Sequence, residues 1–362
     1  MTRWARATVD LGALRSNLEQ ARRRAAHSRV MAVVKADGYG HGLAAVSQAL
    51  AGADALAVSC LEEAELVRAA GATARLVLLE GMFGADELGL LDALWCDAVI
   101  HSDWQIELLR SRQPRRAMDV WLKVETGMHR LGFAPQAVPE AWRRLRECPG
   151  IGQVRFMTHL ACADDRDDAT TREQCESLER ACAGLPGERS LANSAGLLGW
   201  PEAHADWVRP GVMLYGVDPF ADGRPREPLE PVMTLEARLI ARNFCPRGEP
   251  VGYGGTWHAP EDLDLGIVSM GYGDGYPRHA PTGTPVLLAT GRAPLVGRVS
   301  MDMLCIDLRG HPQARPGERV VLWGPGLPVE EVAQHCGTIG YELLCRLTPR
   351  VRRHYREAAV GP

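Results

Sequence analysis

The stretch VMAVVKADGYGHG, residues 30–42, ends an uninterrupted apolar run at a lysine and a glycine-rich turn. Short apolar runs bounded by turn residues are typical of buried strands. Only two of the 41 basic residues are lysines, Lys35 in this stretch and Lys123, and the others are arginines. Arginine keeps its proton and forms no Schiff base, whereas a desolvated lysine amine is a nucleophile. The lysine after this strand is therefore a candidate for covalent chemistry.

Seven further apolar runs follow, and stretches of helical period such as LEEAELVRAAG (61–71) separate most of them. Strands that alternate with helices predict a parallel sheet, and eight is the number that closes a (β/α)8 barrel. An open, doubly wound sheet is the alternative that the pattern leaves open. The eight expected strands lie in VMAVV (30–34), ALAVS (55–59), RLVLLE (75–80), DAVIHS (97–102), MDVWLKVE (118–125), VRFMTHL (154–160), RSLANS (189–194) and WVRPGVMLYG (207–216).

The sequence pattern changes after a proline-rich stretch at residues 219–231. Beyond it, apolar runs such as TPVLLATG (284–291) are separated by turn signals, and helical period returns only near residues 328–337 and 338–347. This pattern is typical of a mainly antiparallel β domain. We expect a barrel domain over residues 1–228 and a C-terminal, mainly β domain over residues 229–362.

Composition excludes several classes of function. The net charge is −4 with both signs scattered, so no basic stripe indicates nucleic-acid binding. No apolar window reaches the length of a membrane span, and the N-terminus has no signal-peptide core. The ten cysteines form no CxxC pair and show no zinc-finger spacing. We therefore expect a cytoplasmic protein with reduced thiols and no metal centre.

Polar side chains recur where the expected strands end, and the C-terminal ends of barrel strands form the active face. A lysine amine there predicts imine chemistry, either with a carbonyl substrate or with pyridoxal phosphate. The small residues and backbone N–H groups of NSAG (193–196) and RPGV (209–212) suit a phosphate group. The candidate residues at these positions are Lys35, Lys123, Arg130, His159, Ser194 and Arg209.

Two glycine-rich stretches lie in the expected β domain. In VGYGGTW (251–257), Tyr253 is either a loop aromatic or an acid–base group brought to the barrel of a partner subunit. The second role needs a neighbour that lowers the pKa of the phenol from near 10. GYGDGYP (271–277) is no dinucleotide fingerprint, because no helix of the required kind follows it.

Long motifs in these stretches resemble those of alanine racemases, and the likeness covers practically the whole chain. It implies a homodimer that interconverts L- and D-alanine with pyridoxal phosphate, supplying or consuming D-alanine, and an N-terminal strand near residues 5–9 that pairs with the C-terminal domain. The motifs are AVVKADGYGHG (32–42), WLKVETGMHRLGF (121–133), THLACADD (158–165), LANSAG (191–196), RPGVMLYG (209–216), VGYGGTW (251–257), GYGDGYPR (271–278), GRVSMDM (297–303) and TIGYELLCRLTPRV (338–351).

The resemblance also implies roles for individual residues. Lys35 would form the Schiff base with the cofactor and act as the base on one face of the substrate. Tyr253 of the second subunit would be the base on the opposite face, and His159 would orient its phenol. Arg209 would lie beyond His159 and donate to the pyridine nitrogen of the cofactor. Lys123 would carry an N-carboxylate that holds Arg130.

The remaining implied roles concern the phosphate and the substrate. Arg130 would contact the phenolic oxygen of the cofactor and the substrate carboxylate. Met301 and Asp302, from the partner, would line the substrate site, and Tyr272 would be an aromatic residue of its entrance. The phosphate would be bound by Tyr39, Ser194, Gly211, Val212 and Tyr341.

Three other functions compete with this one. A cofactor-binding barrel protein without turnover would lack the C-terminal domain. A decarboxylase of similar architecture favours a carboxylate at the pyridine nitrogen, where this chain has Arg209. A racemase that prefers serine or a broader range of amino acids is the third. The pair Asp37-Gly38 stands at a place that is often Asn-Ala in the family, which bears on the geometry of that turn.

Overall fold

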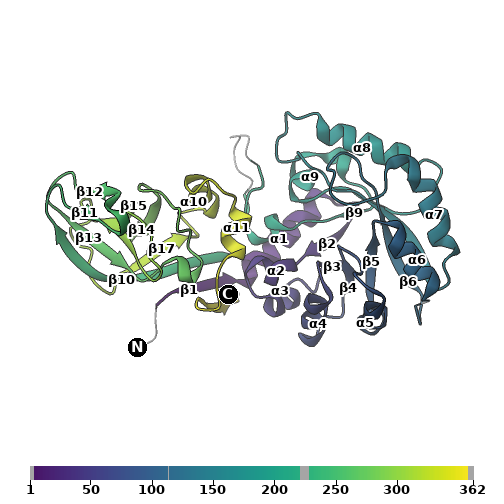
Figure 1. Ribbon diagram of the computed structural model, residues 1–362, viewed down its shortest axis with the longest axis horizontal. Coiled ribbons are helices and arrows are strands. Elements are labelled where there is room, and N and C mark those ends of the chain that lie inside the picture. The colour runs from purple at the N-terminus through teal and green to yellow at the C-terminus, as the bar shows by residue number, and fades with distance from the viewer. Residues whose placement is uncertain (1–3, 113, 221–227, 358–362) are drawn as a thin grey trace.

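The computed structural model describes residues 4–112, 114–220 and 228–357, which form a barrel and an elongated β domain (Figure 1). Eight parallel strands close the barrel, and β9 returns to pair with β2, which confirms the predicted (β/α)8 architecture. The strands are β2 (Arg29–Val33), β3 (Ala55–Val58), β4 (Arg75–Leu78), β5 (Cys96–Ile100), β6 (Met118–Lys123), β7 (Ile151–Met157), β8 (Arg189–Ser190) and β9 (Trp207–Val208).

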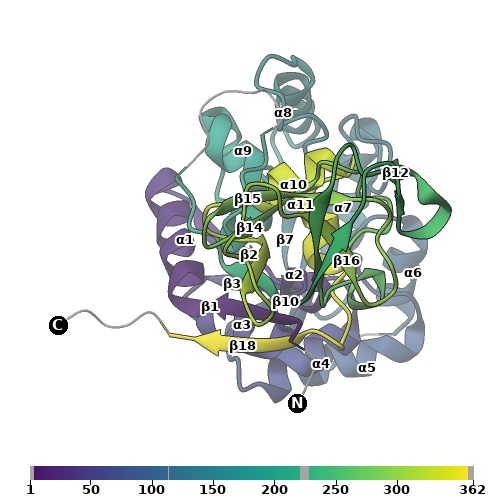
Figure 2. The same cartoon turned by 90° about the vertical axis from the view of Figure 1, so that its left-hand side faces the viewer.

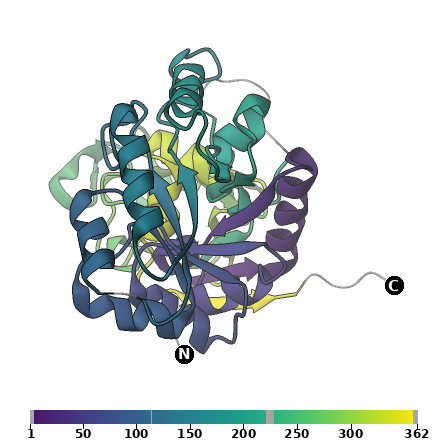
Figure 3. The ribbon, with the colours of Figure 1, turned by 90° about the vertical axis from the view of Figure 1, so that its right-hand side faces the viewer.

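Helices surround the barrel, as the view onto its end shows (Figure 3). They are α1 (Leu11–Arg24), α2 (Lys35–Tyr39), α3 (Leu43–Ala49), α4 (Leu61–Ala69), α5 (Leu88–Leu94), α6 (Asp103–Ser111), α7 (Val138–Glu147), α8 (Thr170–Ala181) and α9 (Ser194–Gly199). Short 3₁₀ turns are η1 (Ala85–Glu87), η2 (Pro135–Ala137), η3 (Pro201–Ala203) and η4 (Val212–Tyr215).

Both faces of the barrel strands are buried, which explains why their sequences are continuous apolar runs rather than alternating ones. In β2, Met31 and Val33 belong to the cluster inside the barrel, whereas Val30 and Ala32 belong to the core beneath the helices. The two sets alternate because successive side chains of a strand point to opposite faces. Trp121 and Trp207 meet edge to face inside the barrel, with ring centroids 5.7 Å apart.

The last two barrel strands are shorter than their apolar runs. Pro210 has no N–H to extend β9, and the following residues turn into η4. Likewise, Ser194 does not end a strand as predicted but begins α9, where the Asn193 side chain accepts a hydrogen bond from Gly196 N at 2.9 Å. These residues remain at the C-terminal ends of the strands, so the correction changes their local structure and not the face that they occupy.

The second domain is built on an eight-stranded sheet in the order β13-β16-β15-β14-β17-β10-β1-β18. Its pairs are antiparallel except for β1 and β18, which run parallel and side by side (Figure 2). The strands are β1 (Arg6–Asp10), β10 (Met233–Cys245), β13 (Leu263–Val268), β14 (Pro285–Leu288), β15 (Gly291–Val296), β16 (Leu304–Asp307), β17 (Arg319–Trp323) and β18 (Arg352–Arg356). The mainly antiparallel β domain expected from the sequence is confirmed.

Shorter elements complete this domain. A two-stranded ribbon of β11 and β12 lies at the end of the domain farthest from the barrel, whereas α10 and α11 lie next to the barrel (Figure 1). These elements are β11 (Pro250–Val251), η5 (Tyr253–Gly255), β12 (Trp257–His258), η6 (Tyr272–Asp274), α10 (Val329–His335) and α11 (Gly340–Cys345).

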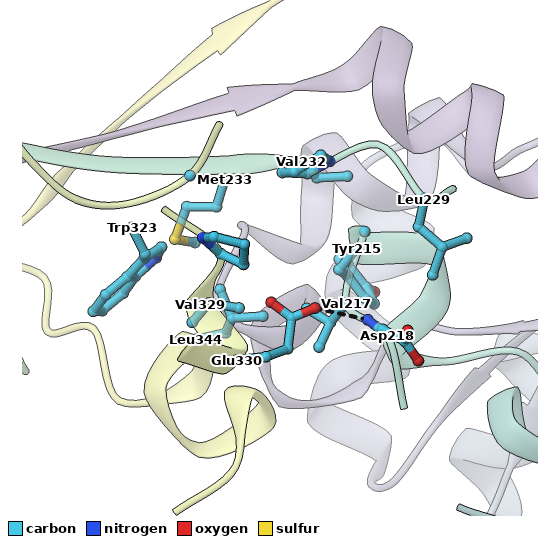
Figure 4. Close-up of a pocket in the computed structure, with 14 residues that line it drawn as sticks. Tyr215, Val217, Asp218, Leu229, Val232, Met233, Trp323, Val329, Glu330 and Leu344 are labelled. Carbon is cyan, nitrogen blue, oxygen red and sulfur yellow. Dashed lines mark hydrogen bonds between the residues drawn. The ribbon is translucent and has the colours of Figure 1, made fainter. Parts of the chain in front are cut away.

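The two domains meet around a small cavity of about 110 Å³ (Figure 4). Tyr215 and Val217 line it from the barrel, and Trp323 and Leu344 line it from the β domain. At its edge the backbone N–H of Asp218 donates to Glu330 at 2.9 Å. Residues 221–227 of the proline-rich stretch lie outside the described residues. Among the described helices, none combines the length and apolar character that crossing a bilayer requires.

Candidate active site

A cavity of about 580 Å³ opens at the C-terminal ends of the barrel strands. Ten of the residues predicted for the site line it, and they come from strand ends scattered over the barrel and from α11 of the β domain. These ten are Lys35, Tyr39, Lys123, Arg130, His159, Ser194, Arg209, Gly211, Val212 and Tyr341. Six of them, Lys35, Lys123, Arg130, His159, Ser194 and Arg209, were expected because barrel chemistry gathers at strand C-termini, whereas the family resemblance implied the phosphate-binding roles of the other four.

Lys35 begins an unusual left-handed turn. Residues 36–40 have φ angles of 53°, 54°, 61°, 51° and 78°, and three of them, Ala36, Asp37 and Tyr39, are not glycine. The left-handed conformation costs about 1–2 kcal/mol for each residue that has a Cβ atom. Strain of this kind persists where surrounding contacts over-determine the backbone, and it clusters at functional sites.

The turn places the Tyr39 side chain over the backbone of Gly211. A Cβ atom on Gly211 would lie only 2.4 Å from the Tyr39 hydroxyl, so no other residue fits without displacement. The Tyr39 ring stacks on Tyr215 at 4.6 Å and lies 6.2 Å from the ring of Tyr341. Burial raises the pKa of both the Tyr39 and Tyr341 phenols. At neutral pH both hydroxyls are protonated and able to donate.

Ser194 joins this group of donors. Its hydroxyl oxygen accepts hydrogen bonds from the backbone N–H groups of Gly211 at 2.9 Å and Met213 at 3.3 Å. The oxygen of Ser194 accepts from both backbone groups, so its own O–H proton is left to donate into the cavity that Tyr39 also lines. Hydroxyl donors at strand ends form a cradle that suits an oxyanion such as phosphate.

Arg209 follows β9 and is buried, with 4% of its surface exposed. Its guanidinium donates to Ser190 Oγ and to the carbonyl of Thr158, both at 2.6 Å. Burial lowers the pKa of Arg209 to about 10. The side chain therefore stays cationic at neutral pH, and its hydrogen bonds fix it in place.

His159 lies two residues beyond β7 and beside Arg209. Arg209 Nη2 lies 3.5 Å from His159 Nδ1, at the long limit of a hydrogen bond in which the imidazole accepts. Burial and the nearby charges of Arg209 and Lys123 hold the pKa of His159 well below its usual range. The ring is therefore neutral at pH 7. Because Nδ1 accepts, Nε2 carries the proton and is able to donate.

Lys123 is the last residue of β6 and is largely buried. Burial, followed by the charges of Arg209 and Arg130, lowers its pKa to about 7. A substantial fraction of this amine is therefore neutral at physiological pH, unlike an exposed lysine. Arg130 lies in the turn after β6, where its backbone N–H donates to Glu125 at 3.3 Å.

Four predicted residues do not line the cavity: Tyr253, Tyr272, Met301 and Asp302. Tyr253 is 67% exposed and lies between β11 and β12, at the end of the molecule farthest from the barrel (Figure 1). The other three come together in the β domain, where the backbone N–H of Tyr272 donates to Ser300 O at 3.0 Å. Arg350 bridges these segments through a hydrogen bond to Asp302 and a 3.4 Å contact with Asp274.

Sequence reasoning missed some of the lining residues. Leu79 and Glu80 follow β4, and Thr158 follows β7, at positions equivalent to those of Lys35 and Arg209. The rule that singled out polar residues at strand ends would have found Glu80 and Thr158. Nothing in the sequence marks Leu131 or Met157, because an apolar side chain at a cavity wall looks like any core residue.

Comparisons with known proteins identify the family of this chain. The family models "Alanine racemase, N-terminal domain" and "Alanine racemase, C-terminal domain" match residues 9–219 and 232–355. The chain belongs to the alanine racemase family. Among the curated alanine racemases, that of Halorhodospira halophila is 56% identical over 356 residues, covering 98% of each chain. That of Chromohalobacter salexigens is 51% identical over 366 residues, covering all of both chains.

Solved structures of alanine racemases share the fold. The biosynthetic alanine racemase of Pseudomonas aeruginosa superposes with a TM-score of 0.95 at 49% identity, covering 98% of this chain and all of that one. The Bartonella henselae enzyme, described with covalently bound pyridoxal phosphate, has a TM-score of 0.89 at 29% identity, covering 98% of this chain and 99% of that one. The family resemblance drawn from the sequence motifs is confirmed.

Proposed function

We propose that this protein interconverts L- and D-alanine with pyridoxal phosphate attached to Lys35. The observation that carries the proposal is the barrel cavity, which holds a lysine amine and a set of oxyanion donors together. Its relatives include alanine racemases at 56% and 51% identity, which supports alanine as the substrate. Serine is the competing substrate that the test below includes.

The residues of the cavity fit the cofactor. The site offers an amine at Lys35 and, in the same cavity, the cradle of Tyr39, Ser194 and Gly211, in which a Cβ on the glycine would meet the tyrosine hydroxyl. Val212 and Tyr341 complete the residues that we assign to the phosphate. Pyridoxal phosphate, when bound, makes the α-proton of an attached amino acid acidic by delocalising the electron pair that remains.

The proton transfer needs one group on each face of the substrate. We assign Lys35 to one face, where its amine removes or returns the α-proton. The second group is Tyr253, supplied by a second copy of the chain. Support comes from its place: Tyr253 is exposed on the ribbon farthest from the barrel, so it does not serve the cavity of its own chain. The enzyme is therefore a homodimer with two shared active sites.

His159 and Arg209 set the protonation of the second base. Arg209 donates to Nδ1 of His159, so the neutral imidazole presents the Nε2 proton. Donation from Nε2 to the phenol oxygen of Tyr253 favours the phenolate and holds it in position. Arg209 itself keeps its proton at neutral pH, so it can only donate to the pyridine nitrogen of the cofactor.

Arg130 holds the substrate carboxylate, and Lys123 holds Arg130 in place. The neutral amine of Lys123 adds to carbon dioxide and loses a proton, which gives an N-carboxylate. That anion pairs with Arg130. The guanidiniums of Arg209 and Arg130 repel a cation at this buried position, whereas they attract the anion that replaces it. Arg130 is then positioned to contact the substrate carboxylate and the phenolic oxygen of the cofactor. Met301, Asp302 and Tyr272 of the partner form the opposite wall and the entrance.

We also place the boundary between the domains at residues 228 and 229, between the two family-model matches. A cytoplasmic location fits the ten unpaired cysteines, since thiols persist where the environment is reducing.

The test is chiral resolution of L-alanine, L-serine and L-lysine after each is incubated with the purified protein and pyridoxal phosphate. We expect L-alanine to reach an even mixture of enantiomers fastest, and Lys35→Ala to racemise none of them. A faster reaction with serine would overturn the assigned substrate. Cofactor binding without racemisation of any amino acid would overturn the enzyme itself.

A further inference from the structure

The left-handed turn at residues 36–40 carries two groups of the proposed site, with Lys35 just before it and Tyr39 within it. Non-glycine residues rarely adopt this conformation in succession. Something outside the turn must therefore hold it. The contacts that surround it come from two directions, one from the barrel and one from the β domain.

From the barrel, Glu63 of α4 accepts a hydrogen bond from the backbone N–H of Ala36 at 2.6 Å. Its other oxygen accepts from Ser59, at the end of β3. His41 Nδ1 donates to the carbonyl oxygens of Gly38, at 3.1 Å, and Tyr39, at 2.8 Å. These contacts fix the start and the exit of the turn.

From the β domain, Arg353 of β18 reaches across to the same turn. Its Nε donates to the carbonyl of Gly40 at 2.7 Å, and its Nη2 lies 3.0 Å from Asp37 Oδ2. The other carboxylate oxygen, Asp37 Oδ1, accepts from the backbone N–H of Leu43 at 2.8 Å. The β domain approaches so closely here that a Cβ on Gly40 would lie 2.0 Å from the carbonyl oxygen of Leu344.

We propose that Asp37 and Arg353 are positioning residues that clamp the catalytic turn to the β domain. The inference rests on the proposed function and deepens it. Arg353 binds both a side chain and a carbonyl of the turn, so the turn cannot relax without breaking both contacts. Strand β18 lies beside β1 in the central sheet, with Arg353 opposite Ala7. The clamp therefore ties the position of Lys35 and Tyr39 to the packing of the second domain.

The clamp also accounts for the acidic residue at position 37. An asparagine at this position would accept from Leu43 through its carbonyl oxygen. Its amide group, however, is a donor and would face the guanidinium, which has no acceptor. Only a carboxylate accepts from Leu43 and from Arg353 at once. Asp37→Asn is therefore a near-isosteric change that removes the pairing with Arg353 and keeps the turn contact.

The experiment is a double-mutant cycle on the holoenzyme with Asp37→Asn, Arg353→Met and the double variant. Hydrogen–deuterium exchange of residues 35–43, release of pyridoxal phosphate after dilution, and kcat and KM for alanine are measured for each. Arg352→Met is the matched control, because Arg352 is its exposed neighbour in β18.

We expect Asp37→Asn to speed exchange of the turn and release of the cofactor about 2- to 5-fold, the range of a partly exposed ion pair. Arg353→Met loses two contacts and should have an effect of about tenfold, and kcat should fall more than KM rises. The double variant should match Arg353→Met, and Arg352→Met should match the parent.

Exchange and release rates in Asp37→Asn equal to those of the parent would overturn the clamp. Additive effects in the double variant would overturn it too, because coupled partners are not additive. Asp37→Asn changes a half-exposed side chain, so this variant is expected to fold. Its exchange and release rates therefore test the clamp even if Arg353→Met does not fold. If the parent holds the cofactor but does not racemise alanine, the proposed function fails, whereas the exchange and release data still decide the clamp.

Discussion

The two walls of the proposed site are built in opposite ways. The barrel wall, formed by the residues that line the cavity, is assembled within one chain, and two of its polar side chains, Ser194 and Arg209, are buried and fixed by hydrogen bonds. The β-domain wall, formed by Tyr253, Tyr272, Met301 and Asp302, lies outside that cavity, and Tyr253 and Met301 are largely exposed.

In the proposed function this difference corresponds to different roles. The barrel wall would hold the cofactor, one base and Arg130, all within one chain. The β-domain wall would provide a second base and further substrate contacts to a neighbouring chain. Changes in the cofactor-binding residues of the barrel wall should therefore affect cofactor binding, whereas changes in the β-domain wall should affect turnover and KM with the cofactor still bound.

The largest effect is expected at Lys35. Lys35→Ala and the charge-preserving Lys35→Arg should both abolish covalent attachment of pyridoxal phosphate, because neither side chain forms a Schiff base. Racemisation should fall by more than the roughly 10²–10⁴-fold that a single acid–base group supplies. Borohydride reduction followed by peptide mass spectrometry measures the attachment. A cofactor adduct on Lys123 in these variants would contradict the assignment.

The next effect is expected in the phosphate cradle. Gly211→Ala places a methyl group 2.4 Å from the present position of the Tyr39 hydroxyl. The displaced cradle should weaken cofactor binding and reduce activity about 100-fold, the scale of a 1 Å misplacement. Titration with pyridoxal phosphate measures the loss. Gly310→Ala is the matched control, since a Cβ there meets nothing within 4 Å; equal effects of both variants would refute the cradle.

How much the sequence predicted also differs between the walls. The eight strands and the polar residues at their ends followed from periodicity, because strands buried on both faces leave long apolar runs in the sequence. The left-handed turn after Lys35 and the two-residue length of β9 did not follow. The left-handed turn depends on long-range contacts such as that between Arg353 and Asp37. The length of β9 depends on Pro210 and on the turn of the chain into η4. For the β-domain wall, only the family resemblance gave the residues.

Lys123 provides a test within the barrel wall. Lys123→Met should raise KM for alanine about tenfold, because Arg130 loses a charge-assisted partner. In buffer free of carbon dioxide, the parent amine has a folded-state pKa of about 7, below its ordinary value. The unfolded state therefore binds more protons between pH 7 and pH 10, and parent stability should rise with pH across this window relative to Lys123→Met.

Urea unfolding with and without bicarbonate measures this pH dependence. Bicarbonate should stabilise the parent relative to Lys123→Met, because the carboxylated amine forms in the folded site and reverts to the free amine on unfolding. A parent stability that bicarbonate leaves unchanged would show that Lys123 stays an unmodified amine.

The smallest effect is expected at Arg350, which bridges the segments of Tyr272 and Asp302 in the β-domain wall. Arg350→Met should raise KM for alanine about 2- to 5-fold, as expected for a partly exposed ion pair. Steady-state kinetics measures the rise, and cofactor binding should be unchanged. Weaker cofactor binding with an unaltered KM would place Arg350 in the other wall.

Subunit exchange tests the shared site most directly. Lys35→Ala and Tyr253→Phe are each nearly inactive by this account, because each removes one of the two bases. Mixed and allowed to exchange, they form heterodimers in which one of the two sites combines an intact Lys35 with an intact Tyr253. Activity should return to about half that of the parent per heterodimer. Exchange proven by mass spectrometry without recovered activity would contradict a site built from two chains.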